Sequence, residues 1–224
     1  MVTARKDKIA WHYESLPVAT TKALEYFSVQ QWIKSSTWYL AGGTALALQA
    51  GHRMSVDLDF FTPLASFHES ALIARLGRNK AWRTTLREQG TVYGEFHRAK
   101  ISFLAYPLFI RAQRPKWHGM VGVLDARDIA VMKIIAITQR GSKRDFFDLF
   151  WCAQHIEPLE DIIRRLKKQY PSVAHDYHHI LKSLVYFDDA EHDPDLQIHF
   201  RASWKMVKEF FTHEVPATTL RLMK

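Results

Sequence analysis

The sequence predicts an α/β (α+β) fold, in which a part that mixes strands and helices is followed by a helical part. Two observations predict this order. Before about residue 110, short apolar runs that stop at glycine or proline alternate with helical patterns. After about Leu124, the long segments carry apolar residues at helical spacing. The polar stretch between them contains Pro115 and Gly119, so we expect one domain at residues 1–120 and a helical part at 121–224.

Each element follows from apolar spacing and from turn residues. Alternating runs rich in β-branched residues indicate strands, and stretches of good helix formers indicate helices. In chain order we expect a helix at 19–35, a strand at 38–43 stopped by glycines, a short helix at 44–50, a strand at 55–61, a helix at 68–78, and two or three strands between 82 and 106 with Gly90 and Gly94 as turns. Helices are expected at 126–140, 143–154, 159–170, 175–187 and 200–211.

The composition is that of an ordinary folded chain, with 224 residues, 47% of them hydrophobic and 24% charged. Its formal charge of +8 permits a polyanionic partner such as RNA, DNA or a nucleotide. The single cysteine, Cys152, excludes an internal disulfide and fits a reducing compartment. The first 18 residues contain no apolar secretory region, and no run approaches the length of a membrane span. We expect a soluble cytoplasmic protein.

Asp57 and Asp59 lie one residue apart in the expected strand at 55–61. Because side chains alternate along a strand, both carboxylates point to the same face, about 7 Å apart along the chain. Two like charges among apolar neighbours are costly unless a cation binds between them or water reaches them. Hard divalent cations such as Mg²⁺ prefer carboxylate oxygen and keep positions open for phosphate oxygen. The pair therefore indicates either a metal site or two solvated aspartates at a sheet edge.

Gly42-Gly43-Thr44 stands between an expected strand and an expected helix, in an order typical of phosphate binding. Glycine lets the backbone approach an anion, and a helix N-terminus offers free N–H groups and a positive dipole. Arg53 and Ser55 add donors just before the carboxylates. A phosphate site that adjoins a metal site is the arrangement that phosphoryl or nucleotidyl transfer needs.

Two blocks of residues resemble the motifs of the AbiEii/AbiGii toxin family, nucleotidyltransferase-like proteins of the DNA polymerase β superfamily. The first block consists of Gly42-Gly43-Thr44, Gly51-His52-Arg53 and Ser55-x-Asp57-x-Asp59-Phe60-Phe61. The second consists of Asp128-x-x-x-x-Lys133 and Arg140-Gly141-x-x-Arg144-Asp145-x-x-Asp148-Leu149. The resemblance covers roughly residues 38–155.

The resemblance implies a polymerase-β-type nucleotidyltransferase core with a small mixed sheet, followed by a helical C-terminal part. It also implies transfer of a nucleotide from an NTP to an acceptor, with Mg²⁺ or else Mn²⁺ as the cofactor. Members of the family are toxins of bacterial toxin–antitoxin and abortive-infection systems, paired with an antitoxin of winged-helix type. Some relatives add nucleotides to the acceptor end of tRNA. The expected partners are therefore an NTP, RNA in the form of tRNA or else a protein acceptor, and a cognate antitoxin, with no membrane.

The resemblance also implies roles for individual residues. Lys133 would neutralise phosphate charge, although a solvated helix lysine is the other interpretation. Asp145 and Asp148 share a helix face, where they either form a surface ion-pair ladder that includes Arg144 or position the acceptor, a base or Lys133. We favour Asp145 as the catalytic aspartate because it follows Arg144 as in the family motif. The expected site residues are Asp57, Asp59, Lys133 and Asp145 for catalysis, Asp57 and Asp59 for metal, and Gly42, Gly43, Thr44, Arg53, Ser55 and Asp148 for substrate.

One part of the superfamily pattern is missing from this sequence. Polymerase-β-type sites usually add a third carboxylate from a later strand, but the expected strand at 100–106 offers only Lys100 and Ser102. Either Glu95 or Asp145 substitutes, or no third carboxylate is used. A binding module that holds a nucleotide or RNA and acts through a partner protein is therefore the alternative function, and a metal-dependent nuclease is a third.

Overall fold

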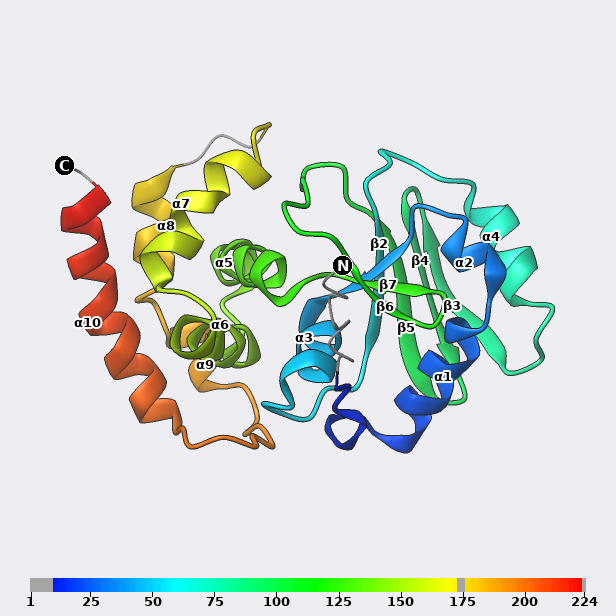
Figure 1. The fold of residues 1–224 in the computed structure, drawn as a ribbon, viewed down its shortest axis with the longest axis horizontal. Helices are drawn as coiled ribbons and strands as arrows, with labels where there is room; N and C mark the ends of the chain where they lie inside the picture. Colours follow the sequence, from blue (N-terminus) through cyan, green and yellow to red (C-terminus); the bar gives the residue numbers. More distant parts are fainter. Residues whose placement is uncertain (1–9, 173–175, 223–224) are drawn as a thin grey trace, which may run out of the picture.

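A seven-stranded mixed sheet and a group of helices beside it form the described part of this computed structural model, residues 10–172 and 176–222 (Figure 1). Two segments for which the sequence made predictions lie partly outside these ranges. They are the N-terminal segment, of which residues 1–9 are not described, and the helix expected from His175.

Helices and strands are mixed up to residue 123, and the elements after it are helices. The first part contains η1 (Tyr13–Ser15), α1 (Val18–Ser28), α2 (Gln31–Lys34), β1 (Tyr39–Ala41), α3 (Gly42–Ala50), β2 (Leu58–Thr62), α4 (Glu69–Leu76), β3 (Trp82–Glu88), β4 (Thr91–Phe96), β5 (Ala99–Ala105), β6 (Lys116–His118) and β7 (Val121–Val123). The helical part contains α5 (Ala126–Arg140), α6 (Lys143–His155), α7 (Leu159–Gln169), α8 (Tyr177–Ser183), α9 (Asp188–Glu191) and α10 (Trp204–Leu222).

The strand order is β3-β4-β5-β2-β1-β7-β6. β2 lies parallel to β5 and antiparallel to β1, and β1 lies parallel to β7. In this register Asp59 of β2 lies opposite Ala41 of β1 on one side and Ser102 of β5 on the other. Asp59 is thus placed beside the residue that precedes α3 and beside a serine of the neighbouring strand.

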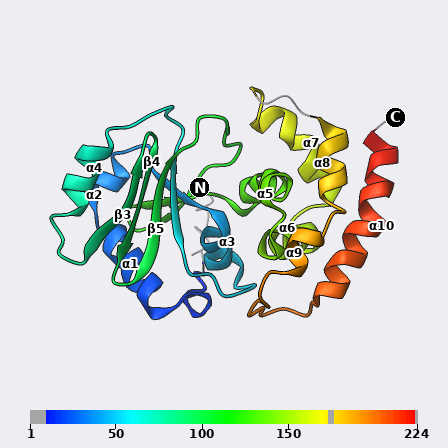
Figure 2. The ribbon, with the colours of Figure 1, turned by 180° about the vertical axis from the view of Figure 1, so that it is seen from behind.

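The two faces of the sheet have different coverings. Helices α1, α2 and α4 lie on one side, and α3 with the helical part lies on the other (Figures 1 and 2). Under α1, the rings of Phe60 and Phe103 stack with centroids 5.0 Å apart, and Phe27 of α1 lies 5.0 Å from Phe60. Because side chains alternate along a strand, Asp59 and Phe61 point away from this core, toward the helical part.

Helix α5 is the centre of the helical part. Helices α6, α7 and α8 pack against it, and so does α3 of the first part. Apolar residues on several sides of α5, including Ile129, Val131 and Ile134, are fully buried, as is typical of a helix surrounded by others. Asp125 caps its start by accepting a hydrogen bond from the Arg127 amide at 3.0 Å, and Gly141 ends it in a left-handed conformation.

Residues 197–199 of the helical part pair with the loop at 52–54. The Met54 amide donates to the Gln197 carbonyl at 2.9 Å, and the His199 amide donates to the His52 carbonyl at 2.8 Å. These bonds hold the loop outside the sheet. The next residues bond outside the sheet as well, since the Ser55 amide donates to the Ser15 carbonyl at 2.9 Å and the Val56 carbonyl accepts from the Thr20 hydroxyl at 2.6 Å. β2 begins only at Leu58, so the predicted strand start at Ser55 is wrong and Asp57 lies just before the strand.

Most predicted elements are confirmed, several with shifted ends. The structure contains β1, the helices α4 to α7 at or within two residues of their predicted ends, and a strand at each of the runs between 82 and 106. Helix α3 begins two residues early, at Gly42. The division proposed at residue 120 falls between β6 and β7. Since β7 still pairs with β1, the helices themselves begin only at Ala126.

Other predicted ends are wrong. The helix at 19–35 is two helices, separated at Val29 and Gln30, without a glycine or proline to mark the break. Gly94 is not a turn but lies inside β4, and it leaves room for the Trp82 ring, which a Cβ there would approach within 2.4 Å. The β4–β5 turn is instead made by His97 and Arg98, both at positive φ.

At the C-terminal end, α8 stops at Ser183, and α10 starts at Trp204 and continues past Pro216 to Leu222. In the described ranges, no helix combines the length and the apolar character that a bilayer span requires.

The Phe27 side chain gives a test of this core. We expect Phe27→Ala to lower the free energy of unfolding by about 3–5 kcal/mol, because it leaves a cavity beneath Phe60 and Phe103. Val18→Ala on the same helix, where Val18 is 72% exposed, should change it by less than about 0.5 kcal/mol. Urea unfolding followed by circular dichroism measures both, and equal losses for the two variants would contradict the described packing.

Candidate active site

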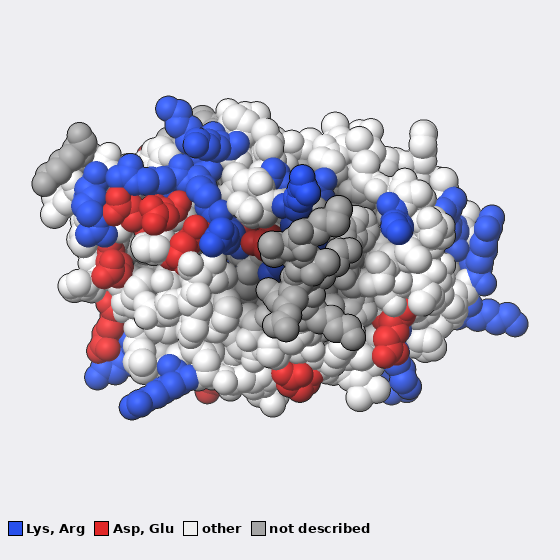
Figure 3. All heavy atoms as spheres, in the orientation of Figure 1, with Lys and Arg blue, Asp and Glu red and all other residues white. Residues whose placement is uncertain are grey.

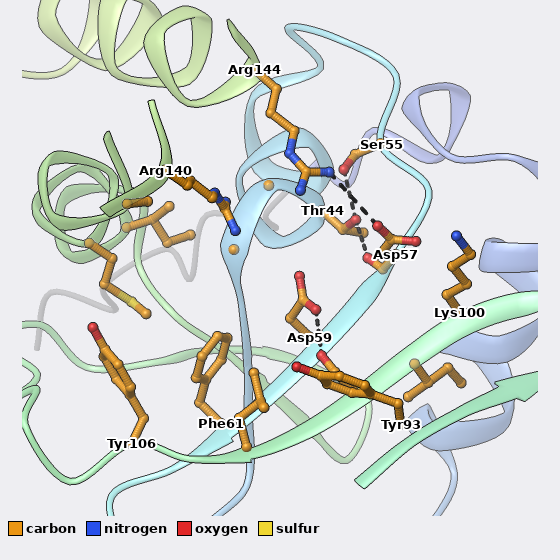
Figure 4. A pocket seen from close by; sticks show the side chains of 18 of the residues that line it. Thr44, Ser55, Asp57, Asp59, Phe61, Tyr93, Lys100, Tyr106, Arg140 and Arg144 are labelled. Carbon is orange, nitrogen blue, oxygen red and sulfur yellow. Dashed lines mark hydrogen bonds and ion pairs between the residues drawn. The ribbon is translucent and has the colours of Figure 1, made fainter. Parts of the chain in front are cut away.

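A cavity of about 650 Å³ lies between the sheet and α5 (Figure 4). One end is polar and is lined by the start of α3, by the two aspartates at β2 and by basic side chains of α5 and α6. The other end is apolar, with Phe61, Tyr106 and Met132 among its lining residues. Of the predicted site residues, the cavity is lined by Gly42, Gly43, Thr44, Arg53, Ser55, Asp57, Asp59 and Lys133, whereas Asp145 and Asp148 lie behind it.

The two glycines at the start of α3 are required by close contacts. Gly42 has a φ of +73°, and a Cβ added to it would come within 2.9 Å of Asp59 Oδ2. A Cβ on Gly43 would come within 2.4 Å of Arg53 Nη2. The N-cap residue, Ala41, makes no side-chain cap hydrogen bond, so among the described residues the first amides of the helix are open to an anion. Phosphate binding by this segment stays a prediction, which the glycine contacts and the uncapped helix start are compatible with.

Thr44 and Ser55 fix the chain that leads into the first carboxylate. The hydroxyls of Thr44 and Ser55 are 2.8 Å apart, and the Thr44 hydroxyl also donates to the Asp57 carbonyl. Both residues are buried, whereas the Asp57 side chain is 35% exposed. The backbone at Asp57 is therefore held firmly while its carboxylate faces the cavity mouth.

Asp59 is the deeper of the two carboxylates. Its Oδ1 accepts a hydrogen bond of 2.5 Å from the Ser102 hydroxyl. Burial raises the pKa of Asp59 above its usual range; the Ser102 hydrogen bond opposes this rise, and the nearby Asp57 carboxylate adds to it. The ionised form of Asp59 is thus short of positive partners, which is the condition under which a bound cation is favourable.

Asp148 is the centre of a buried ion-pair network. Its carboxylate accepts from Arg53 Nε at 2.6 Å and from Nη2 at 2.8 Å, from His52 Nε2 at 2.7 Å, and pairs with Lys133 Nζ at 2.6 Å. Burial alone would raise the pKa of Asp148, but Arg53, Lys133 and the His52 hydrogen bond hold it well below its usual range. Burial lowers the pKa of His52, which favours the neutral ring.

Asp145 is the second carboxylate behind the cavity. It accepts from Lys133 Nζ at 2.7 Å and from the Arg140 guanidinium at 2.8 and 3.1 Å. Lys133 is thus enclosed between Asp145 and Asp148 with only 4% of its surface exposed. The interpretation of Lys133 as a solvated lysine and that of the aspartates as a surface ladder are both wrong. The two carboxylates position Lys133, which was one of the alternatives.

The i,i+4 spacing on α6 suggested an ion pair between Arg144 and Asp148, but the structure does not contain this pair. Arg144 Nη1 lies 3.9 Å from Asp57 Oδ2 at the cavity mouth, and both side chains are partly exposed. Asp148 is turned inward instead, because Arg53 and Lys133 meet it there. Sequence reasoning also missed Tyr93, which lines the cavity from β4. The sequence offered one indication of Tyr93: it lies two residues before Glu95, the candidate third carboxylate, so both side chains point to the same face of the strand.

The carboxylates of Asp57 and Asp59 are suitable ligands for a divalent cation, but they are only two. Mg²⁺ is commonly bound by one or two carboxylates together with water and substrate phosphates. Asp57 is partly exposed, and the raised pKa of Asp59 marks a carboxylate whose negative charge a bound cation would stabilise. Within residues 10–172 and 176–222, no group of three or more His, Cys, Asp or Glu side chains is placed to hold a metal. The site therefore fits a cation that the substrate helps to bind.

The comparison with protein families identifies the chain. The model described as nucleotidyl transferase AbiEii toxin, type IV toxin–antitoxin system, matches residues 32–103 and 107–219. The chain belongs to the AbiEii toxin family. This match confirms the resemblance drawn from the two sequence blocks, and it places the protein among the nucleotidyltransferase toxins of toxin–antitoxin systems.

Three known proteins resemble this AbiEii protein in sequence or in fold. A protein of Aquifex aeolicus (strain VF5), itself uncharacterized, is 39% identical over 189 residues, which cover 80% of this chain and 86% of that protein. A proposed nucleotidyltransferase from H. pylori has a TM-score of 0.54 at 17% identity, covering 90% of this chain and 94% of its own. The toxin MenT4 of Mycobacterium tuberculosis has a TM-score of 0.52 at 16% identity, covering 92% and 87%. These two structures confirm the mixed α/β nucleotidyltransferase fold.

The network around Asp148 predicts a strong effect on stability. We expect Asp148→Asn to lower the free energy of unfolding by about 3–5 kcal/mol at pH 7, because Arg53 and Lys133 lose a buried counter-charge. Asp195→Asn is the matched control; its carboxylate is fully exposed, and the change should be within about 0.5 kcal/mol.

The same network predicts how the free energy of unfolding changes with pH. The folded-state pKa of Asp148 is depressed, so its stabilising contribution is complete above the unfolded pKa of about 3.9 and is lost as the pH falls toward the folded value. The difference in unfolding free energy between the wild type and Asp148→Asn should therefore narrow below about pH 4. A difference that stays constant from pH 7 to pH 3 in urea titrations would contradict the ion pairing.

Proposed function

We propose that this AbiEii protein is a Mg²⁺-dependent nucleotidyltransferase, the toxin of a toxin–antitoxin or abortive-infection system, and that it transfers a nucleotide from an NTP to the 3′ end of a tRNA. The observation that carries the proposal is the meeting of Asp57, Asp59 and the open start of α3 in one cavity. A helix N-terminus suits phosphate, and paired carboxylates suit the cation that accompanies it.

The proposed reaction forms one bond and breaks one. The acceptor hydroxyl oxygen bonds to the α-phosphorus of the NTP, and the bond from that phosphorus to the pyrophosphate oxygen breaks. Pyrophosphate leaves, and the hydroxyl proton passes to water. In this reaction the first amides of α3 orient the phosphates, and the Arg140 and Arg144 guanidinium groups neutralise their charge. The network of Asp145 and Asp148 keeps Lys133 and Arg53 fixed beside them.

Asp57 and Asp59 would hold the metal, with Mg²⁺ or Mn²⁺ accepted by the same oxygen ligands. A bound divalent cation would supply neutralisation of phosphate charge and a lower pKa for the attacking hydroxyl. The Ser102 hydroxyl keeps the Asp59 carboxylate turned toward the cavity. With Ser102 at this position of β5, the site would work with two carboxylates at the cation.

The apolar end of the cavity supports binding of the nucleobase there. Phe61 and Tyr106 lie at the end away from Asp57 and Lys100 (Figure 4). Met132 of α5 lines the same end. Aromatic and thioether groups give a base stacking area without demanding one pattern of hydrogen bonds. The volume of about 650 Å³ lies within the range of small-molecule sites.

The remaining parts of the proposal follow from the family. A description as a type IV toxin–antitoxin system supports an antitoxin protein as the partner, and we propose one of winged-helix type. We also propose that the protein acts in the cytoplasm, where NTPs and tRNA are available.

The transfer can be tested with each labelled NTP in turn, total tRNA and Mg²⁺. We expect label on RNA with wild-type protein, and a loss of more than about 100-fold in Asp57→Asn and in Asp59→Asn, since even groups that only support metal ligands are worth about 10- to 100-fold. EDTA should abolish labelling, and added Mg²⁺ or Mn²⁺ should restore it. Asp161→Asn, at an exposed position of α7, is the control and should retain activity.

Two outcomes would overturn the proposal. Retention of an NTP without label on any RNA would favour the non-catalytic binding module. Shortened RNA would favour a nuclease that uses the same carboxylates.

The contact between Gly43 and Arg53 predicts an effect on NTP affinity. A Cβ in Gly43→Ala would displace the guanidinium and disturb the start of α3, so we expect the Kd for an NTP to rise about tenfold or more. Gly122→Ala is the control, because a Cβ there meets its neighbours at an ordinary 3.7 Å. Isothermal titration calorimetry measures both. Unchanged affinity in Gly43→Ala would show that the start of α3 does not bind the phosphates.

A further inference from the structure

Two side chains on the cavity wall, Tyr93 and Lys100, have no partner within the described residues. No hydrogen bond, ion pair or ring contact involves either of them there. Tyr93 is 39% exposed on β4, and Lys100 is exposed on β5. Figure 4 shows the Tyr93 ring next to Asp59 and the Lys100 side chain on the side of Asp57. Both therefore border the carboxylates, at the end of the cavity opposite Tyr106.

The other basic groups of the cavity are already paired. Arg53 is bonded to Asp148, and Lys133 and Arg140 are bonded to Asp145. Arg144 lies within ion-pair distance of Asp57. Of the basic side chains that line the described cavity, Lys100 alone has no carboxylate partner, so its charge is the one most open to an incoming anion.

The sheet face around Tyr93 forms an open surface that is continuous with the cavity. Tyr93 lies opposite Ser102, which bonds to Asp59, and opposite Leu86 of β3, which is 37% exposed. Thr85 lies at the irregularity between Thr84 and Leu86 and also lines the cavity. An exposed tyrosine beside an exposed leucine on a sheet is a surface on which a planar ring can stack.

The nearest carboxylate on this surface does not cancel the charge of Lys100. Glu95 lies opposite Lys100 across β4 and β5, but its Oε2 accepts a hydrogen bond of 2.9 Å from Arg83 Nη2. Arg83 therefore neutralises Glu95 and leaves the surface with a net positive charge from Lys100.

We propose that this face of β3, β4 and β5 binds the single-stranded end of a nucleic-acid acceptor, with Tyr93 stacking a base and Lys100 contacting the backbone phosphate next to it. The proposal rests on the proposed function, because it takes the carboxylates at Asp57 and Asp59 as the place of transfer. Single-stranded nucleic acid is bound by aromatic side chains that stack bases and by basic groups that follow the backbone. Tyr93 and Lys100 supply one of each within a single strand pair.

The basic helix α7 is the other surface that could bind a polyanion, and its arginines are less available. Arg164 is paired with Glu160, and Arg165 with Glu157. Figure 3 shows the same mixture, with acidic side chains next to basic ones over the region of α7. This pairing lowers the field that α7 presents, and the helix offers no exposed aromatic side chain among its described residues.

The test is binding of a fluorescein-labelled single-stranded RNA of about ten nucleotides, measured by anisotropy without NTP. We expect Tyr93→Ala to weaken binding by about tenfold or more and Tyr93→Trp to preserve it, since stacking needs only an aromatic ring. Lys100→Ala should reduce the slope of log K against log salt by about one, and Lys100→Arg should restore it. The matched controls are Tyr186→Ala, a tyrosine 48% exposed, and Lys205→Ala on α10.

The outcomes separate this proposal from the proposed function. RNA affinity that is equal in wild type, Tyr93→Ala and Lys100→Ala would overturn it, as would an equal loss in the two controls. In transfer assays, Tyr93→Ala should raise KM for the RNA acceptor and leave the Kd for the NTP unchanged. An altered NTP affinity would reassign Tyr93 to the nucleotide and overturn the proposal.

Loss of RNA binding in Tyr93→Ala would support the RNA-binding surface even if no nucleotide were transferred to RNA. A protein that takes label at a hydroxyl, independent of Tyr93, would identify a protein acceptor instead.

Discussion

The buried carboxylate of Asp148 holds the two parts of the molecule in register. It lies on α6 of the helical part, and it binds Arg53 and His52 from the loop before β2 and Lys133 from α5. A carboxylate without exposed surface is costly on its own, and this one is compensated by a two-point bond to a guanidinium and by a lysine. Removal of Asp148, Arg53 or Lys133 would leave a buried charge without its full counter-charge, so the three charged groups depend on one another.

The cavity is shaped by this one interaction. Arg53, held by Asp148, occupies the space where a side chain of residue 43 would be, and this requires glycine at the start of α3. The loop that carries Arg53 bonds to residues 197–199, the strand begins only at Leu58, and Asp57 lies before the strand at the cavity mouth. Arg53 thus explains the glycine at the helix start, and the loop that carries it leads to a carboxylate that is partly exposed.

The sequence is sufficient for those features that depend on neighbours along the chain. Helix α5 follows from its apolar spacing, and the glycine pair together with the spacing of Asp57 and Asp59 indicates a phosphate and metal site. The sequence does not predict partners far apart in the chain. Arg53 and Asp148 are 95 residues apart, and the i,i+4 spacing suggested Arg144 as the partner of Asp148. Tyr93 was missed because an exposed tyrosine in a strand becomes informative only when its neighbour across the sheet, Ser102, is seen to bond to Asp59.

The balance of charge explains why the site would need a cation in addition to its own basic groups. Arg53, Lys133, Arg140 and Arg144 face the carboxylates of Asp57, Asp59, Asp145 and Asp148, so these groups are close to neutral together. A triphosphate adds negative charge to a cavity wall that is already balanced. Asp145 and Asp148 fix the basic groups in place, and each fixed group has less of its charge left for phosphate. A divalent cation at Asp57 and Asp59 would restore the balance, and it would release Arg144 from Asp57 to face the substrate.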